Sequence, residues 1–174
     1  GINKAIFREA VVMQMTWPGA PTVYYGDEAG VCGFTDPDNR RTYPWRQEDH
    51  ELIAFHKAMI AIHKENKELL TGSLKFLTND YQFLSYGRFT NQEKSVIVIN
   101  NSEESKTVEL SVWELGISRI RDSHFTQLIV TGDFGYSLIK KVHVCKGGVL
   151  RLVLPSHGAM VLKHSKNNGV KVDR

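Results

Sequence analysis

The sequence predicts an α+β fold in which a short helical segment precedes an antiparallel β-sandwich. Apolar residues recur at helical spacing in two stretches before Gly72, and a long run without any period separates these stretches. After Gly72, short β-type runs alternate with turn clusters of Asn, Gly, Ser, Glu and Lys. We therefore divide the 174 residues into a helical segment, 1–72, a sandwich, 73–165, and a polar tail, 166–174.

The first helix is predicted over residues 4–16, KAIFREAVVMQMT. Ile6, Ala10 and Met13 recur there at steps of three and four residues. The Pro18-Gly19 pair ends the helix, because proline cannot continue it and glycine permits a turn. The apolar face of this helix needs a partner to cover it.

A strand is predicted over 22–25, TVYY, since β-branched and aromatic residues favour extended structure. From 29 to 46 no period survives, and the run VCGFTDPDNRRTYPWR is rich in Gly, Pro, Asp and Asn. We interpret it as a long loop, and loops of this length in compact domains are usually functional or disordered.

A second helix is predicted to begin after Asp49, a plausible N-cap, and to end near Leu70, with Gly72 as the stop signal. Its apolar stripe consists of Leu52, Phe55, Met59 and Ile62. The runs that follow are LKFLTND, YQFLSYGRFT, SVIVINN, KTVELSV, FTQLIVTG, GGVLRLVLP and GAMVLK. Their spacing is typical of an antiparallel sandwich.

Composition and charge exclude several classes of function. The net charge is +3, and Lys and Arg are scattered, which disfavours nucleic-acid binding. No apolar run approaches the roughly 18 residues of a membrane span, so no membrane partner is expected. Cys32 and Cys145 lie far apart without zinc-binding spacing. We therefore expect free thiols, a cytoplasmic location, and neither a metal nor a cofactor.

The stretch PTVYYGDEAG places two carboxylates, Asp27 and Glu28, directly after the predicted strand. One strand cannot form a sheet, so its neighbours must come from elsewhere, as in a piece of an alternating α/β fold. In a (β/α)₈ barrel the active-site groups follow the C-terminal ends of the strands, and these acids occupy that place.

The residues PGAPTVYYGDEAG, followed by DPDNRR and YPW, resemble the end of the catalytic barrel of the alpha-amylase family, glycoside hydrolase family thirteen. Within that family they are most similar to the neopullulanase, cyclomaltodextrinase and maltogenic-amylase group. The resemblance implies that 1–72 holds the last helix–strand–helix elements of a barrel and that 73–165 is the C-terminal sandwich domain. It implies a parent enzyme that hydrolyses maltodextrins, cyclodextrins or pullulan with retention, through a glycosyl-enzyme intermediate.

The resemblance also implies where the catalytic residues lie. Family members carry three catalytic acids on the fourth, fifth and seventh barrel strands, all of which are expected before Gly1. The chain starts with Gly rather than Met, which agrees with a cut or processed end. We therefore expect no catalytic residue in this chain, no hydrolysis by the chain alone, and the missing barrel segment as its main partner. A homodimer is left open.

A structural role is expected for Tyr25, Asp27 and Glu28. Neighbouring residues of a strand point to opposite faces, whereas the two carboxylates of a retaining pair flank one bond at about 5 Å. Asp27 and Glu28 are therefore expected to accept hydrogen bonds from the loop backbone or from arginines, close to the site without taking part in the chemistry.

Asp36 and Arg40, in DPDNR, match positions that contact sugar hydroxyls in the neopullulanase-like group. A carboxylate accepts from two vicinal hydroxyls, and a guanidinium donates a planar fork. The alternative is an Asp–Arg pair that only holds the loop together. Tyr43 and Trp45 are expected to anchor the loop to the core, with stacking on a sugar face as the alternative.

Two other classes of function stay open, a carbohydrate-binding module and a purely structural domain. A binding module would expose aromatic side chains on the sandwich. Tyr81, Phe83, Tyr86 and Phe89 alternate as core residues do, which argues against this alternative.

Overall fold

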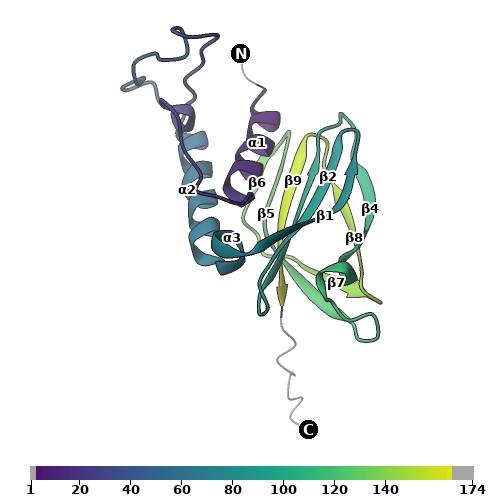
Figure 1. Cartoon of the computed structure of the whole chain (residues 1–174). Coiled ribbons are helices and arrows are strands. Elements are labelled where there is room, and N and C mark those ends of the chain that lie inside the picture. Colours follow the sequence, from purple (N-terminus) through teal and green to yellow (C-terminus); the bar gives the residue numbers. More distant parts are fainter. Residues whose placement is uncertain (1–2, 166–174) are drawn as a thin grey trace.

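The computed structural model describes residues 3–165, so the predicted tail, 166–174, lies outside the described residues. Helices α1 (Lys4–Thr16), α2 (His50–Glu65) and α3 (Lys67–Thr71) lie together on one side of a curled, antiparallel sheet (Figure 1). None of the described helices is both long enough and apolar enough to cross a membrane.

Both predicted helices form, and their ends have clear local causes. The Asn3 side chain caps α1 by accepting from the backbone of Ala5 at 3.0 Å. The Asp49 side chain caps α2 by accepting from the backbone of Leu52 at 3.1 Å. The second helix is interrupted at Asn66, whose side chain donates to the carbonyl of Ile62 at 2.7 Å. The single predicted helix is therefore two.

The apolar stripe of α2 is buried as predicted. Leu52, Phe55, Met59 and Ile62 are between 0% and 7% exposed. Burying a side chain of this size contributes about 1.5–3 kcal/mol relative to leaving it in water, so the stripe fixes the helix against the sheet.

The predicted strand at 22–25 is wrong. This segment forms no ladder and leads into a single 3₁₀ turn, η1 (Asp27–Ala29). Strand geometry needs a neighbour to satisfy its backbone groups, and no described strand pairs with this segment. Residues 31–49 have no regular structure, which confirms the loop.

Within residues 3–165, nine strands form one sheet in the order β1-β2-β3-β9-β5-β7-β8-β4, with β6 paired to β5, and all neighbours are antiparallel. The strands are β1 (Ser73–Asp80), β2 (Phe83–Phe89), β3 (Lys94–Asn100), β4 (Lys106–Ser111), β5 (Ser123–Gly132), β6 (Gly135–Ser137), β7 (Val142–Lys146), β8 (Val149–Leu154) and β9 (Gly158–Ser165). A 3₁₀ turn, η2 (Val112–Leu115), follows β4. The sheet curls until its end strands, β1 and β4, approach each other, which agrees with a sandwich domain.

Every predicted β-run contains a strand, whereas β6 and β7 were not predicted. β6 has three residues and β7 has five, and both mix polar residues with apolar ones. Tyr81 also differs from the prediction, because it is 85% exposed at the turn between β1 and β2. Phe83 and Tyr86 are buried as expected.

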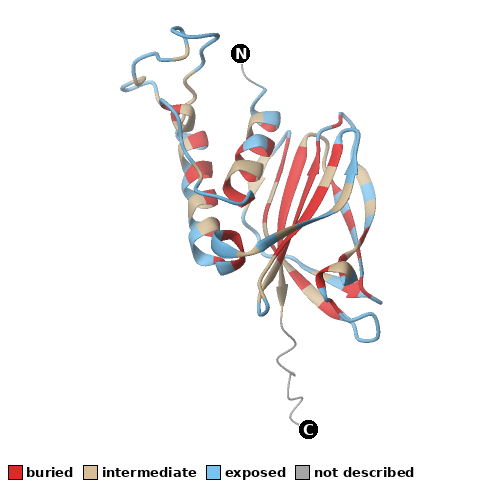
Figure 2. Ribbon diagram, in the orientation of Figure 1, coloured by how far each residue is buried: buried red, intermediate tan, exposed pale blue. Residues whose placement is uncertain are grey.

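The buried apolar residues of the described part of the chain form two clusters (Figure 2). The first fills the interior of the curled sheet and includes Val96, Val98, Phe125, Leu150, Leu152 and Leu162. The second lies between the sheet and the helices, and it includes Val12, Met15, Phe55, Met59, Tyr86, Ile97, Ile129 and Val161. The outer face of β2, β3, β9 and β5 is therefore covered by α1 and α2.

Arg88 connects the helical segment to the sheet. It is 1% exposed, and its guanidinium donates to the carbonyl of Thr16 at 2.6 Å and to that of Gly72 at 2.9 Å. Beside it, the hydroxyls of Tyr86 and Thr16 lie 2.6 Å apart. These bonds satisfy the end of α1 and the turn after α3 from a residue of β2.

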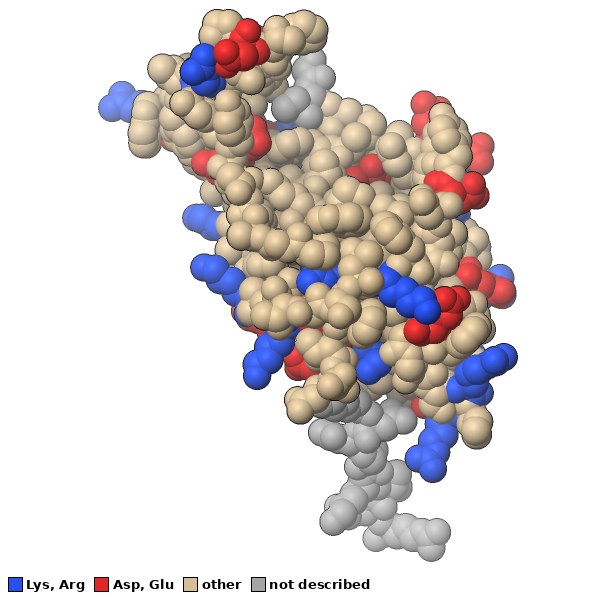
Figure 3. Space-filling model, in the orientation of Figure 1, with Lys and Arg blue, Asp and Glu red and all other residues tan. Residues whose placement is uncertain are grey.

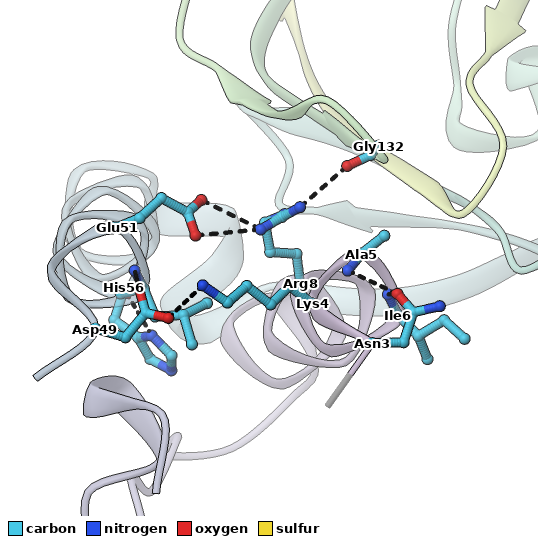
Figure 4. A network of polar contacts seen from close by, with 10 residues as sticks. Asn3, Lys4, Ala5, Ile6, Arg8, Asp49, Glu51, His56 and Gly132 are labelled. Carbon is cyan, nitrogen blue, oxygen red and sulfur yellow. Dashed lines mark hydrogen bonds and ion pairs between the residues drawn. The ribbon is translucent and has the colours of Figure 1, made fainter. Parts of the chain in front are cut away.

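Arg8 makes a second connection, at the other end of α1 (Figure 4). Its guanidinium donates to both carboxylate oxygens of Glu51 in α2, at 3.2 and 3.3 Å, and to the carbonyl of Gly132 in β5 at 3.2 Å. Lys4 pairs with Asp49 in the same network. The two helices and the sheet are thus joined by polar contacts at both ends of α1.

Candidate functional site

The loop at 31–49 precedes α2 and extends beyond the N-terminal end of that helix (Figure 1). Two backbone bonds shape its tip, from Asp38 to Thr35 at 2.8 Å and from Arg40 to Pro37 at 3.1 Å. Most of its residues are exposed, and none is fully buried (Figure 2). The loop is thus a turned segment in which most side chains face solvent.

Two ion pairs lie side by side on this tip. The Arg40 guanidinium pairs with both carboxylate oxygens of Asp36, at nitrogen–oxygen distances of 2.7 and 3.0 Å. The Arg41 guanidinium pairs with the Asp38 carboxylate in the same way, and its shortest nitrogen–oxygen distance is 2.7 Å. All four side chains are between 45% and 65% exposed. Exposed pairs of this kind contribute little to stability, about 0–1 kcal/mol.

The two pairs differ in what else they hold. Asp38 also accepts from the backbone of Phe34 at 2.9 Å, which closes the turn. The hydrogen bond from Arg41, and then that from Phe34, hold the pKa of Asp38 below its usual value. Asp36 bonds only to Arg40 among the described residues. The Asp38–Arg41 pair is therefore also tied to the loop backbone, whereas the side chains of the Asp36–Arg40 pair bond only to each other among the described residues.

The structure brings Asp36 and Arg40 into direct contact, as the loop-holding alternative expects. The contact does not decide between that alternative and sugar binding. The substrate role of the pair stays a prediction.

Of the two aromatic residues expected to anchor the loop, Trp45 is not placed as expected. Trp45 is 77% exposed, and Phe34 on the same loop is 85% exposed, so neither lies against the core. Tyr43 is half-buried, and its ring lies next to Gly26, close enough for a Cβ there to meet it at 3.4 Å. The rings of Tyr43 and Trp45 are 4.7 Å apart. Tyr43 therefore lies against the buried Gly26, as expected of an anchor, whereas Trp45 contacts the Tyr43 ring and is otherwise mostly exposed.

Asp27 and Glu28 lie in η1, behind the loop. With three residues per turn, neighbouring side chains point about 120° apart, so the argument that they do not act together holds without a strand. Burial raises the pKa of Asp27, and Glu28 raises it further, while His56 opposes this. No arginine pairs with either acid among the described residues, and Glu28 Oε2 is buried without a partner there.

Asp27 lines a cavity of about 240 Å³ between η1 and the helices, together with Gln14 and His56. Tyr25 has a left-handed backbone, φ +44°, and is 53% exposed. The structural role predicted for Tyr25, Asp27 and Glu28 stays a prediction, with hydrogen bonds from arginines ruled out inside the described residues. In that part of the chain, no three His, Cys, Asp or Glu side chains are grouped to hold a metal ion.

No family model matches the chain. Neopullulanase 2 of Thermoactinomyces vulgaris is 35% identical to it over 166 residues, which cover 93% of this chain and 26% of the relative. An amylopullulanase of Thermoanaerobacterium saccharolyticum is 30% identical over 88% of this chain and 12% of its own. The solved alpha-amylase of Geobacillus thermoleovorans, complexed with acarbose, superposes on 94% of this chain at 26% identity, with a TM-score of 0.79.

The chain belongs to the alpha-amylase family. The resemblance predicted from the sequence is therefore confirmed, and the partial coverage fits a C-terminal portion of such a protein. The chain spans about a quarter of neopullulanase 2 and about a third of the solved alpha-amylase. As a member of the alpha-amylase family it is related to glycoside hydrolases that act on α-glucosidic bonds.

Sequence reasoning did not single out Glu9 and Asp133, two acidic residues that the fold brings near each other. Glu9 in α1 is 4% exposed, and its Oε1 has no partner among the described residues. Burial and the nearby Asp133 raise the pKa of Glu9 to about 8. Because Glu9 and Asp133 are 124 residues apart, no local sequence pattern predicts that they lie close together.

Proposed function

We propose that this chain is part of a retaining α-glucan hydrolase that acts on maltodextrins, cyclodextrins or pullulan. The observation that carries this proposal is the match over 93% of the chain to an enzyme named neopullulanase 2. Relatives named cyclomaltodextrinase and amylopullulanase support it. Because the chain spans only 26% of neopullulanase 2, we assign the three catalytic acids to a barrel segment outside it.

In this proposal Asp36 and Arg40 bind a sugar next to the cleaved bond. Their exposure and the absence of other partners in the described residues support this role. When a sugar arrives, vicinal hydroxyls donate to the Asp36 carboxylate, and the Arg40 fork donates to ring or hydroxyl oxygens. Trp45 offers an exposed aromatic face on the same loop.

The barrel segment is the second partner of this proposal. A hollow of about 530 Å³ runs along the end of α1 and the chain that follows it, lined by Trp17, Pro18 and Pro21 among others. Val23 and Tyr24, just beyond, are 39% and 44% exposed. Apolar side chains in such numbers favour a covering element, and the preceding barrel is the one we propose. We also propose a cytoplasmic location, in which Cys32 and Cys145, both unpaired, stay reduced.

The test is an assay of reducing sugar released from maltotriose, β-cyclodextrin and pullulan. The 174-residue chain should release none, while the longer natural protein should turn over at an ordinary rate, about 1–1,000 per second. Turnover by the 174-residue chain that is abolished in Asp27→Asn overturns the assignment of the catalytic acids. An inactive longer protein overturns the proposed function itself.

A carbohydrate-binding sandwich is the second candidate, and one observation favours it. Tyr81 and Phe76, at one end of the sheet and on its edge strand, are 85% and 47% exposed. An exposed ring can stack on a sugar face. Maltooligosaccharide binding by the isolated chain that is lost in Tyr81→Ala favours this candidate, and no binding favours the first.

A further inference from the structure

A small pocket lies at the end of the sandwich where β3 begins and β9 ends. Figure 1 shows β9 ending at the lower end of the sheet. The volume of the pocket is about 190 Å³. The first residue of β3, the segment between η2 and β5, and the last residues of β9 line it. It is therefore built entirely by the sandwich and shares no residue with the helical segment.

The charged side chains of the pocket are mainly basic. Lys94 and Arg121 line it, and Asp122 is the one acid among its lining residues. Their formal charge is +1 with His164 neutral and +2 with His164 protonated. Figure 3 shows Lys and Arg side chains over the lower part of the molecule, the part in which this end of the sheet lies. The pocket thus favours an anion over a cation.

Two buried polar atoms of residues that line the pocket have no nitrogen or oxygen partner among the described residues. The Nε2 atom of His164 is buried and has no partner among the described residues. Ser123 is 7% exposed, and its hydroxyl has no nitrogen or oxygen partner there, only the thiol of Cys145, a weak acceptor. Burial and the nearby Lys94 lower the pKa of His164. Polar atoms buried without partners are costly, and a ligand oxygen would satisfy them.

We propose that this pocket binds a small oxyanion of the phosphate class. Lys94 and Arg121 provide the charged contacts, and Ser123 and His164 donate hydrogen bonds. A guanidinium matches two phosphate oxygens, and the volume suits one phosphate group better than a longer chain. The phosphate is either free or carried by a sugar, since both present the same oxygens.

The test is a titration of the 174-residue chain with inorganic phosphate at constant ionic strength, followed by backbone amide NMR. We expect saturable shifts at residues 116–123 and 164–165. Arg121→Gln and Lys94→Met should each weaken binding by about ten-fold or more, as expected for a lost charge-assisted bond. Lys106→Met, at the opposite end of the sheet, is the matched control and should change binding less than about two-fold.

The results distinguish free phosphate from a sugar phosphate and show whether the site exists. A hexose phosphate that binds more tightly than phosphate, with no shifts from glucose, identifies a sugar phosphate as the ligand, and equal binding identifies free phosphate. Absence of saturable shifts, or equal losses in Lys106→Met and Arg121→Gln, overturns the site. Because no glucan is involved, this result is independent of the proposed hydrolase function.

Discussion

Replacing Arg88 by Met should weaken the attachment of the helical segment to the sandwich and lower the free energy of unfolding. The substitution keeps an unbranched apolar side chain in place of the arginine stem. It removes the two bonds to the carbonyls of Thr16 and Gly72, of which Thr16 is fully buried. The acceptors are left without a donor in the described structure.

The magnitude follows from these two bonds. A hydrogen bond to a charged group contributes about 1.5–3 kcal/mol, so two of them contribute about 3–6 kcal/mol. Burial lowers the pKa of Arg88, which shows that desolvation of the guanidinium opposes part of this gain. We therefore expect a loss of about 3 kcal/mol in the free energy of unfolding.

Urea denaturation of the 174-residue chain, followed by circular dichroism, measures this loss. Tyr86→Phe is the matched control on the same strand, because it removes only the neutral bond to Thr16, and it should cost about 1 kcal/mol. Arg88→Lys should fall between the two. A loss below about 1 kcal/mol in Arg88→Met, at an unchanged m-value, refutes the reasoning.

Two further predictions follow from the packing. A chain that begins at Ser73 should still give dispersed amide spectra and a cooperative melt, because the interior cluster is complete within 73–165. It should be less stable than the full chain, since the outer face of the sheet is uncovered, and the boundary at Gly72 is wrong if only the full chain folds. Glu9 keeps its proton to about pH 8 in the folded chain, whereas the unfolded chain releases it near 4.5. Stability should therefore fall as the pH rises between these values, and Glu9→Gln should flatten this fall, with a higher Tm than wild type at pH 8 and a similar one at pH 4. Parallel profiles of Tm against pH in the two proteins contradict this.

Much of the fold could be predicted because its causes are local. Caps at Asn3 and Asp49, and apolar residues three and four positions apart, define the helices within a few residues of sequence. Strands β6 and β7 were missed because they are short and owe their extended shape to β5, their neighbour in the sheet. The strand prediction for 22–25 was wrong for the opposite reason. Its residues favour a strand, but no described strand lies beside them to pair with.

The candidate site divides in the same way. The Asp36–Arg40 pair is four residues apart, so a motif can reveal it. The exposure of Trp45 depends on where the loop turns, which residue types alone do not determine. The basic pocket joins Lys94, Arg121 and His164, and only the pairing of distant strands brings these residues together.

The most direct test of the central claim is the kinetics of Asp36→Asn and Arg40→Gln in the longer natural enzyme. If the pair grips a sugar beside the cleaved bond, each variant should lose about 1.5–3 kcal/mol of transition-state stabilisation, or roughly 10- to 150-fold in kcat/KM, at a nearly unchanged Tm. Asp38→Asn, in the neighbouring pair that closes the loop, is the control and should lower Tm more than kcat/KM. Unchanged kcat/KM per folded molecule in both Asp36→Asn and Arg40→Gln, with a lowered Tm, would contradict the account and leave the pair as a holder of the loop.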